Sequence, residues 1–399
     1  MPFTRSFDAS VAPDPATGLF NTSLLAKGLG VRPATVKTMR ARGQVPEPTA
    51  TIGGSYVWAK EEIYRFYGVR NTQGETRLEG IPPADPALPQ VVDLFSGCGG
   101  LSLGFQRSGF DILAGFDNWS CAVDTYKANM GHEAYLLDLS DISLTIETLG
   151  QFFASTDQTP ALIGGPPCQD FSSAGKRREG ARADLTEKYA NIVAHFMPPF
   201  FVMENVARAK HAAAFKSAVS TFERAGYFVR YLVIDSSRVG VPQTRKRLIT
   251  VGTPSEKLTE TIFDALIFDQ SEHQTTVREY FSETLGTPLE IDFYYRHPRS
   301  YARRGVFSVD EPSPTIRGVN RPIPTGYPGH SGDAGPIHSA RPLSTAERSL
   351  IQTFPRNFQW VGSRTAVEQM IGNAVPVELG AFIGRSIARA LSSPGSAAN

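Results

Sequence analysis

The chain has 399 residues, of which 41% are hydrophobic and 20% charged, and its formal net charge is +1. This length predicts two or three domains with a sizeable core, and the composition is typical of a soluble globular protein. No run approaches the roughly 20 apolar residues of a membrane span, and residues 1–20 lack the apolar segment of a signal peptide. Three cysteines without a CxxC pair argue against structural zinc, so we expect a cytoplasmic protein with no membrane partner and no metal.

The first 70 residues predict a small separate domain. Residues 24–30 and 33–42 have helical patterns joined by a glycine turn, residues 45–56 predict a hairpin, and residues 59–67 predict a third helix. This arrangement resembles a winged helix-turn-helix of the MerR or excisionase type. The resemblance implies that basic side chains of the second helix face DNA: Lys37, Arg40 and Arg42.

The function of this first domain stays open at the level of sequence. If it binds DNA, it either represses the protein's own promoter or adds grip on a DNA substrate. The alternative is a small helical domain that serves protein contacts or stability.

A linker is expected over residues 71–90, which are rich in Gly and Pro. After it, apolar strand candidates alternate with amphipathic helical segments. The strand candidates lie near residues 90–95, 111–116, 134–137, 161–164, 199–203, 229–234 and 248–252. This alternation predicts an α/β fold with a parallel, doubly wound sheet, which we assign to a domain of residues 91–254. The rhythm breaks from about 255 to 340, and helical patterns return at residues 344–353 and 376–391.

The first strand runs into the glycine-rich turn Ser96-Gly-Cys-Gly-Gly100. Glycines let a backbone approach a ligand closely, and ligands of α/β sheets lie beyond the carboxyl ends of the strands. Asp117 ends the second strand, where an acidic residue can accept hydrogen bonds from a ribose. The turn departs from the G-x-G-x-x-G pattern, which disfavours NAD. An ordinary tight turn is the alternative.

A cysteine follows a stiff Pro-Pro pair in Gly164-Gly-Pro-Pro-Cys-Gln169, after the fourth apolar run. Because proline restrains its own backbone and that of its predecessor, Cys168 is held on a constrained loop, which suits a nucleophile. A buried cysteine beside a turn is the alternative. Glu204 ends the next strand, and Arg245 and Arg247 precede the last one.

These motifs occur in a set order, with Gln243-Thr-Arg-Lys-Arg247 and Gly372-Asn373 completing the series. Together they resemble the DNA cytosine-5 methyltransferase family, over roughly residues 88–395. The resemblance implies a Rossmann-like domain that binds S-adenosylmethionine, a target-recognition domain over residues 255–342, and a segment, 343–399, that completes the catalytic domain. The implied cofactor contacts are Phe95, Gly97, Gly99, Gly100, Leu101, Asp117, Asn118, Asp138, Leu139, Pro166, Asn373 and Val375.

The chemistry of such an enzyme gives the polar residues distinct roles. Cytosine C5 does not attack a methyl sulfonium unaided, so a thiolate must first add at C6. The family pattern makes Cys168 this nucleophile, Glu204 the partner of N3 and Arg245 the partner of O2, while Arg247 braces the loop and Glu204. The target base must be flipped out of the duplex before the thiolate can reach it.

Residues 169–180 are polar and punctuated by glycine, which predicts a lid over the DNA. Simple solvation is the alternative for the basic side chains of this lid. Residues 315–322 are the tightest cluster in the recognition domain and our first choice for base reading. The expected DNA contacts are Gln169, Ser172, Lys176, Arg177, Arg178, Gln243, Arg299, Arg303, Arg304, Arg317 and Arg321.

We therefore expect a site-specific bacterial DNA methyltransferase that acts as a monomer on double-stranded DNA. Its own promoter and a cognate restriction endonuclease are further expected partners. One alternative is an RNA cytosine-5 methyltransferase, but the tRNA-acting branch carries a Cys-Phe-Thr motif in its variable region and no cysteine follows Cys168 here. The other is a DNA-binding regulator with an inactive catalytic half, against which the intact catalytic motifs argue.

Overall fold

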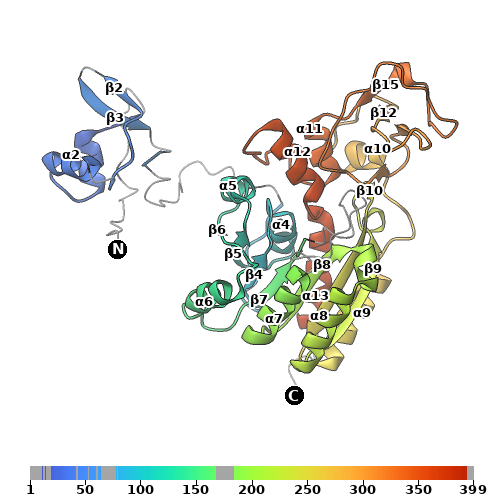
Figure 1. Cartoon of the computed structure of the whole chain (residues 1–399), viewed down its shortest axis with the longest axis horizontal. Helices are drawn as coiled ribbons and strands as arrows, with labels where there is room; N and C mark the ends of the chain where they lie inside the picture. The colour runs from blue at the N-terminus through green and yellow to red at the C-terminus, as the bar shows by residue number, and fades with distance from the viewer. Residues whose placement is uncertain are drawn as a thin grey trace. The chain divides into compact units, whose positions relative to one another are not determined.

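The computed structural model describes residues 11, 14, 19–41, 44–52, 54–59, 62–63, 78, 80–167 and 184–392. The chain divides into two compact units, Met1–Thr76 and Arg77–Asn399 (Figure 1). Several predicted site residues lie outside the described residues: Arg42, Cys168, Gln169, Ser172, Lys176, Arg177 and Arg178.

In the part of the smaller unit that the structure describes, a three-stranded sheet is accompanied by two helices with defined bounds. Its elements are β1 (Leu19–Asn21), α1 (Thr22–Gly28), α2 (Pro33–Ala41), β2 (Ala50–Ile52) and β3 (Ser55–Ala59). The Asn21 side chain caps α1 by accepting the N–H groups of the two residues at the start of the helix, and β3 lies between β1 and β2. The two helices and the hairpin occur where the sequence predicted them, whereas β1 was not predicted. Most of the predicted third helix lies outside the described residues.

A seven-stranded sheet organises the larger unit, in the order β6-β5-β4-β7-β8-β11-β9. Its strands are β4 (Val91–Leu94), β5 (Ile112–Asp117), β6 (Glu133–Leu136), β7 (Ala161–Gly164), β8 (Phe201–Val206), β9 (Phe228–Asp235) and β11 (Lys246–Thr253). The prediction of a parallel sheet is wrong for one strand, because β11 runs antiparallel to both β8 and β9. The connection over residues 236–245 is shorter than the dozen or so residues of a parallel crossover, so the chain turns back beside β9.

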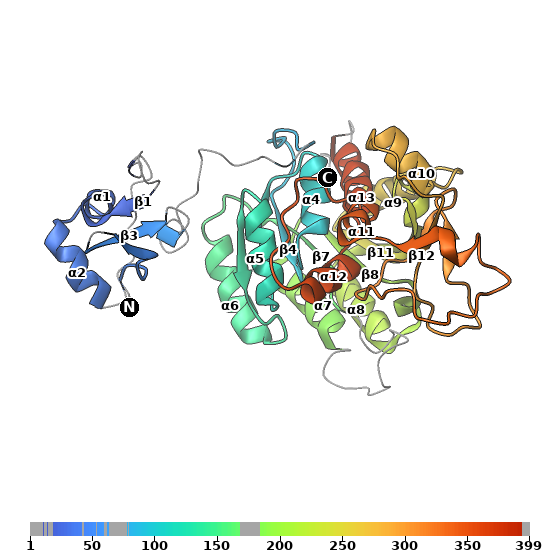
Figure 2. The ribbon, with the colours of Figure 1, turned by 90° about the horizontal axis from the view of Figure 1, so that it is seen from above.

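Helices cover both faces of this sheet (Figure 2). One apolar cluster joins the sheet to α4 (Gly100–Arg107), α9 (Glu256–Phe268) and α13 (Val377–Ser392). Another joins it to α6 (Ile142–Phe153), α7 (Asp184–Phe196) and α8 (Ala213–Arg224). The remaining helix of this part, α5 (Ser120–Asn129), packs against β5 and β6. The C-terminal α13 thus lies in the same layer as α4, and the Ser108 hydroxyl donates to the Ala381 carbonyl at 2.9 Å.

Helix α9 corrects the prediction that the regular pattern ends near residue 255. Its Ser255 cap accepts the Leu258 N–H at 3.3 Å, and Ile262 and Leu266 are buried in the cluster with α4 and α13. The four-residue spacing of Leu258, Ile262 and Leu266 was the available signal for this helix.

An irregular region lies between α9 and α11 (Thr345–Ile351), in orange at the upper right of Figure 1. Its short elements are α10 (Val277–Glu279), the π-helix η4 (Tyr280–Thr284), β12 (Phe293–Tyr295), β13 (Val306–Ser308), β14 (Ser313–Pro314), the 3-10 helix η5 (Ile337–Ser339) and β15 (Ala340–Pro342). β12 pairs with β13 and β15, while β14 pairs with β10 (Gln243–Thr244) in the connection before β11. The sequence did not predict α12 (Arg364–Asn373), whose buried face joins the apolar cluster of this region.

Part of the predicted linker belongs to the larger unit. The Asp85 N–H donates to the Gly109 carbonyl at 2.8 Å, and Leu88 is buried with residues of α4 and α13. Across the described parts of the chain, no helix has the length and apolarity needed to cross a membrane. Within the same residues, no group of three or more His, Cys, Asp or Glu side chains is arranged to hold a metal ion.

Candidate active site

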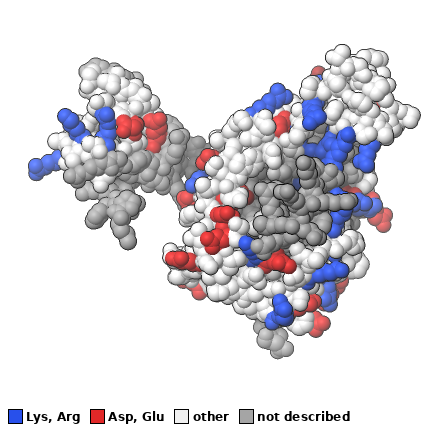
Figure 3. Space-filling view, in the orientation of Figure 1, with Lys and Arg blue, Asp and Glu red and all other residues white. Residues whose placement is uncertain are grey.

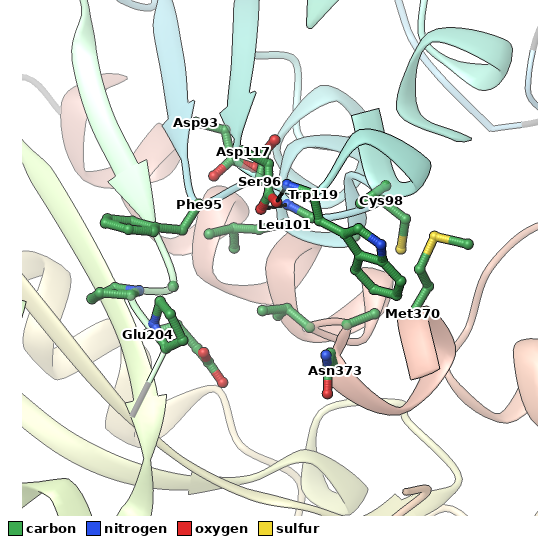
Figure 4. A pocket seen from close by; sticks show the side chains of 18 of the residues that line it. Asp93, Phe95, Ser96, Cys98, Leu101, Asp117, Trp119, Glu204, Met370 and Asn373 are labelled. Carbon is green, nitrogen blue, oxygen red and sulfur yellow. Dashed lines mark hydrogen bonds between the residues drawn. The ribbon is translucent and has the colours of Figure 1, made fainter. Parts of the chain in front are cut away.

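A cavity of about 670 Å³ lies at the carboxyl ends of β4, β5, β7 and β8 (Figure 4). This is where α/β sheets bind ligands. All but one of the predicted cofactor residues line it: Phe95, Gly97, Gly100, Leu101, Asp117, Asn118, Asp138, Leu139, Pro166, Asn373 and Val375. The structure thus brings together residues from both ends of the larger unit, and their role as cofactor contacts stays a prediction.

The turn after β4 has an unusual backbone. Phe95 has φ 60° and Gly97 φ 54°, in the left-handed region that costs a non-glycine residue free energy. A strained phenylalanine in the cavity wall is typical of a functional turn. Gly99 is the exception among the predicted contacts, because it does not line the cavity. Its φ of 92° starts α4, and a Cβ there would collide with side chains of Met130 and Tyr126.

Asp117 organises the turn from the neighbouring strand. Its Oδ2 accepts the Gly97 N–H and its Oδ1 accepts the Trp119 N–H, each at 2.8 Å. Burial raises the pKa of Asp117 above its ordinary value, while these backbone hydrogen bonds oppose the shift. Carboxylate oxygens accept more than one hydrogen bond, so Asp117 can hold the turn and still contact a ribose. Asp138 is exposed at the far wall, and the Ser140 N–H is the main cause that lowers its pKa.

The start of α4 and the end of α12 meet across the cavity. A Cβ on Gly100 would collide with the Val375 carbonyl oxygen, so only glycine permits this approach. Asn373 is the last residue of α12. The segment that follows, with Val375, leads directly into α13 and closes one wall of the cavity.

The cavity residues that were not among the predicted contacts include Asp93, Trp119 and Met370. Asp93 lies within β4, is fully buried and accepts the Ser102 hydroxyl at 2.6 Å, and burial raises its pKa to about 7. Its signal in the sequence was a charged residue inside an otherwise apolar strand. Met370 gave no such signal, because α12 itself was not predicted.

Glu204 and Arg247 form an ion pair at the wall of the cavity. Arg247 Nε lies 2.6 Å from Glu204 Oε1, and both side chains are largely buried. β8 supplies the glutamate and the antiparallel β11 the arginine, so the reversed strand direction creates the pair. The Asn205 side chain donates to the Pro166 carbonyl at 3.4 Å and thereby links β8 to the Pro-Pro turn that precedes Cys168.

Arg245 has different surroundings from those expected of a substrate contact. Its side chain is buried, Nη1 donates to the Ile316 carbonyl at 3.3 Å, and Nη2 donates to the Gly372 carbonyl at 3.1 Å. Burial, aided by the charge of Arg247, lowers the pKa of Arg245 well below its ordinary value. The cation beside Glu204 is Arg247, as the family pattern predicted, whereas the contact of Arg245 with the base stays a prediction.

The DNA contact expected of Gln243 stays a prediction, and the surroundings of this residue do not favour it. The side chain is fully buried, donates to Gln352 Oε1 at 2.7 Å and accepts the Ile316 N–H at 2.8 Å. Both partners lie far along the chain, which is why sequence reasoning could not find them.

A second, basic cavity of about 470 Å³ adjoins the first and shares Val206 and Arg247 with it. We call it the arginine cavity; the arginines that line it are Arg208, Arg247, Arg296, Arg299, Arg303, Arg304 and Arg317. Figure 3 shows basic side chains gathered on this face of the larger unit. The predicted DNA contacts Arg299, Arg303, Arg304 and Arg317 thus lie together, whereas Arg321 is exposed at a small neighbouring hollow.

Arg304 and Arg317 are already engaged within the protein. Both terminal nitrogens of Arg304 donate to Glu311, at 2.9 and 2.6 Å, and its guanidinium lies 4.3 Å from the centre of the Phe307 ring. Arg317 donates to the His297 carbonyl. Arg304 is therefore better suited to shape the cavity than to read a base. Arg303 is exposed at the rim.

In the smaller unit, Lys37 is exposed on α2. Arg40 on the same helix lies 4.1 Å from the centre of the Tyr56 ring and 3.5 Å from Glu47. These contacts join α2 to the hairpin region, so Arg40 is partly used within its own unit.

The larger unit has a mixed α/β sheet that is also found in methyltransferases of known structure. Two solved structures share it: a putative DNA modification methyltransferase from an E. coli prophage (TM-score 0.54, 20% identity, covering 77% of this chain and 100% of that one) and the Dnmt2 methyltransferase of S. pombe (TM-score 0.54, 16% identity, 77% and 100%). At this identity they show the fold alone.

The model of the C-5 cytosine-specific DNA methylase family matches residues 89–389, and the chain belongs to that family. It is similar to the Type II methyltransferases M.HgiDI of Herpetosiphon aurantiacus (48% identity, 76% of this chain and 96% of that protein) and M.HindV of Haemophilus influenzae (48%, 75% and 96%). The protein is thus a DNA cytosine-5 methyltransferase, which confirms the family expected from the sequence motifs.

Proposed function

We propose that this enzyme is the modification methyltransferase of a Type II restriction-modification system and methylates cytosine within one double-stranded DNA sequence. The Type II relatives, matched over 96% of their length, support this class. The observation that carries the mechanism is the Glu204–Arg247 pair, in the wall of the cofactor cavity and next to the Pro-Pro turn that leads to Cys168.

The residues of the cavity fit S-adenosylmethionine. Phe95, Leu101 and Trp119 offer apolar surfaces for an adenine, and Asp117 and Asp138 offer acceptors for hydroxyl and amino groups. Gly100 lies so close to the Val375 carbonyl that a larger side chain at position 100 would displace this wall of the cavity. When bound, S-adenosylmethionine supplies an electrophilic methyl group.

The chain's own residues then activate the base. The Cys168 thiolate forms a bond to C6 of a flipped cytosine, and the displaced ring electrons move towards N3 and O2. Glu204 passes a proton to N3, while C5 becomes nucleophilic and takes the methyl group. The C5 proton then leaves to water and Cys168 is eliminated as the thiolate, which restores the C5–C6 double bond. N3 returns its proton to Glu204, so the neutral methylated base and the starting form of the enzyme are regenerated.

The contacts favour Arg247 over Arg245 as the cation near O2. Arg247 occupies Glu204 Oε1 and leaves Oε2 for the base, whereas both terminal nitrogens of Arg245 are bound to carbonyls. Arg247 also lines the arginine cavity, where phosphates of the DNA would be held. Arg299 and Arg303 supply further positive charge there.

The N-terminal unit adds a second DNA contact through α2, with Lys37 as its exposed basic residue. Its target is either the protein's own promoter or the substrate. The larger unit carries a complete set of catalytic motifs, so the enzyme acts on its substrate as a monomer, beside a cognate restriction endonuclease that cleaves the same site.

Bisulfite sequencing of a plasmid tests the proposal, after incubation with the full-length protein and S-adenosylmethionine. Protected cytosines in one recurring sequence, absent with Cys168→Ala, would support both the activity and the nucleophile. Protection that persists with Cys168→Ala would refute the covalent mechanism, and protection spread over all sequences would refute a Type II modification role.

A further inference from the structure

The recognition segment, residues 315–318, is fixed at Ile316 by two buried side chains. The Ile316 N–H donates to Gln243 Oε1 at 2.8 Å, and Arg245 Nη1 donates to the Ile316 carbonyl at 3.3 Å. Ile316 is itself buried, so neither backbone group has water as a substitute partner. Both polar groups of this residue therefore depend on the connection that leads into β11.

The same side chains reach the end of α12. Gln243 Nε2 donates to Gln352 Oε1 at 2.7 Å, and Gln352 Nε2 donates to the carbonyls of Ile371 and, at 3.2 Å, Ala374. Arg245 Nη2 donates to the Gly372 carbonyl at 3.1 Å. We call Gln243, Arg245 and Gln352 the polar junction, because they join the recognition segment to the last turn of α12 by two routes.

The two joined segments also touch directly. A Cβ on Gly372 would collide with the backbone of Arg317 and Gly318, so main chain packs on main chain there. Neither segment can shift without disturbing the other. Breaking a hydrogen bond of the polar junction would leave a buried polar group unpaired, which costs roughly 1–3 kcal/mol.

Each joined segment borders a different ligand cavity. Asn373 and Val375, at the end of α12, line the cofactor cavity, whereas Thr315 and Arg317 line the arginine cavity. Gln243 and Gln352 line neither cavity, so they are positioning residues.

We propose that the polar junction couples the two cavities, so that a cofactor held by the end of α12 fixes the recognition segment for DNA. By thermodynamic linkage, DNA then raises the affinity for the cofactor by the same factor. The inference rests on the proposed function, because it takes the two ligands to be S-adenosylmethionine and DNA.

The test measures coupling rather than turnover. Fluorescence anisotropy gives the Kd of the full-length protein for a labelled duplex bearing the site found by bisulfite sequencing, with and without saturating S-adenosylhomocysteine. We expect the cofactor product to tighten DNA binding of the wild type by a factor in the range of roughly 5 to 150. In Gln352→Met, which keeps the side-chain length but removes the hydrogen bonds, this factor should fall, because only the route through Arg245 and the direct main-chain contact remain.

Thr259→Val is the matched control. Thr259 is a buried polar residue of α9 whose hydroxyl contacts Thr253 at 2.9 Å, and it borders neither cavity. It should lose stability but keep the wild-type factor. Equal loss of coupling in Thr259→Val would overturn the proposal, because general destabilisation would then explain the effect.

Two further results would overturn it: a wild-type factor of one, or an unchanged factor in Gln352→Met. If thermal unfolding shows that Gln352→Met does not fold, Gln243→Met replaces it, because it removes the same Gln243–Gln352 hydrogen bond. An unchanged factor in Gln243→Met would overturn the proposal in the same way. Failure of the bisulfite experiment would instead refute the proposed function, so the two failures are distinguishable.

Discussion

The Glu204–Arg247 pair gives the sharpest prediction of stability. The two atoms are 2.6 Å apart, and the side chains are only 11% and 13% exposed. Removing one partner of a buried ion pair leaves the other charge uncompensated, at a cost of about 3–5 kcal/mol. Because both groups border a cavity that water can enter, we expect the low end, about 3 kcal/mol, for Glu204→Gln and for Arg247→Met.

The double variant Glu204→Gln/Arg247→Met separates the interaction energy of the ion pair from the separate effects of the two substitutions. With no charge left uncompensated, it should lose less than the sum of the single losses, by about 1–3 kcal/mol. Urea unfolding of all four proteins without ligand measures this interaction energy. Additivity within about 0.5 kcal/mol would refute the reasoning, since the two side chains would then act independently.

Three further predictions follow from the larger unit. Gly100→Ala should weaken the binding of S-adenosylhomocysteine at least about tenfold by calorimetry, because its Cβ meets the Val375 carbonyl. The control Gly131→Ala, which has open space around its Cβ, should bind with the affinity of the wild type. Equal affinity of the two variants would contradict the role of the close contact between Gly100 and Val375. The raised pKa of Asp93, about 7, means that the folded state binds its proton more tightly, so this residue's contribution to stability falls as pH rises from about 4 to 7, and Asp93→Asn should flatten that part of the pH profile of unfolding. If the pH profile of unfolding of Asp93→Asn equals that of the wild type, a group other than Asp93 causes this part of the profile. Deleting residues 1–76 should leave a cooperatively folding larger unit, and loss of the thermal transition would show that the two units depend on each other.

The sequence was most informative where local pattern decides structure. Apolar runs predicted every strand of the large sheet, since strands such as β7 are buried on both faces. The direction of β11 was missed, because it depends on how the chain turns after β9 rather than on composition. Helix α12 was missed for a related reason: only part of its surface is apolar, and that part is buried by a region far away in sequence.

In the candidate site, too, the sequence predicted the residues placed by local structure but not the partners set by tertiary packing. Phe95 follows β4, Asp117 ends β5 and Glu204 lies near the end of β8, so their place at one edge of the sheet follows from strand order. Gln243 and Arg304 were expected to meet DNA because they are polar residues in basic segments. Their actual partners, Gln352 and Glu311, are set by tertiary packing, and nothing local distinguishes a polar residue with such a partner from one that faces solvent.

The wall at Val375 has a consequence for how the enzyme is made. The residues that line the cavity begin with Asp93, and its last wall forms only when the chain that follows the recognition region has packed against α4. During translation, the glycine-rich turn leaves the ribosome hundreds of residues before its last wall exists. A polypeptide that ends before Val375 therefore lacks one wall of this cavity, and we expect prematurely terminated products not to methylate DNA.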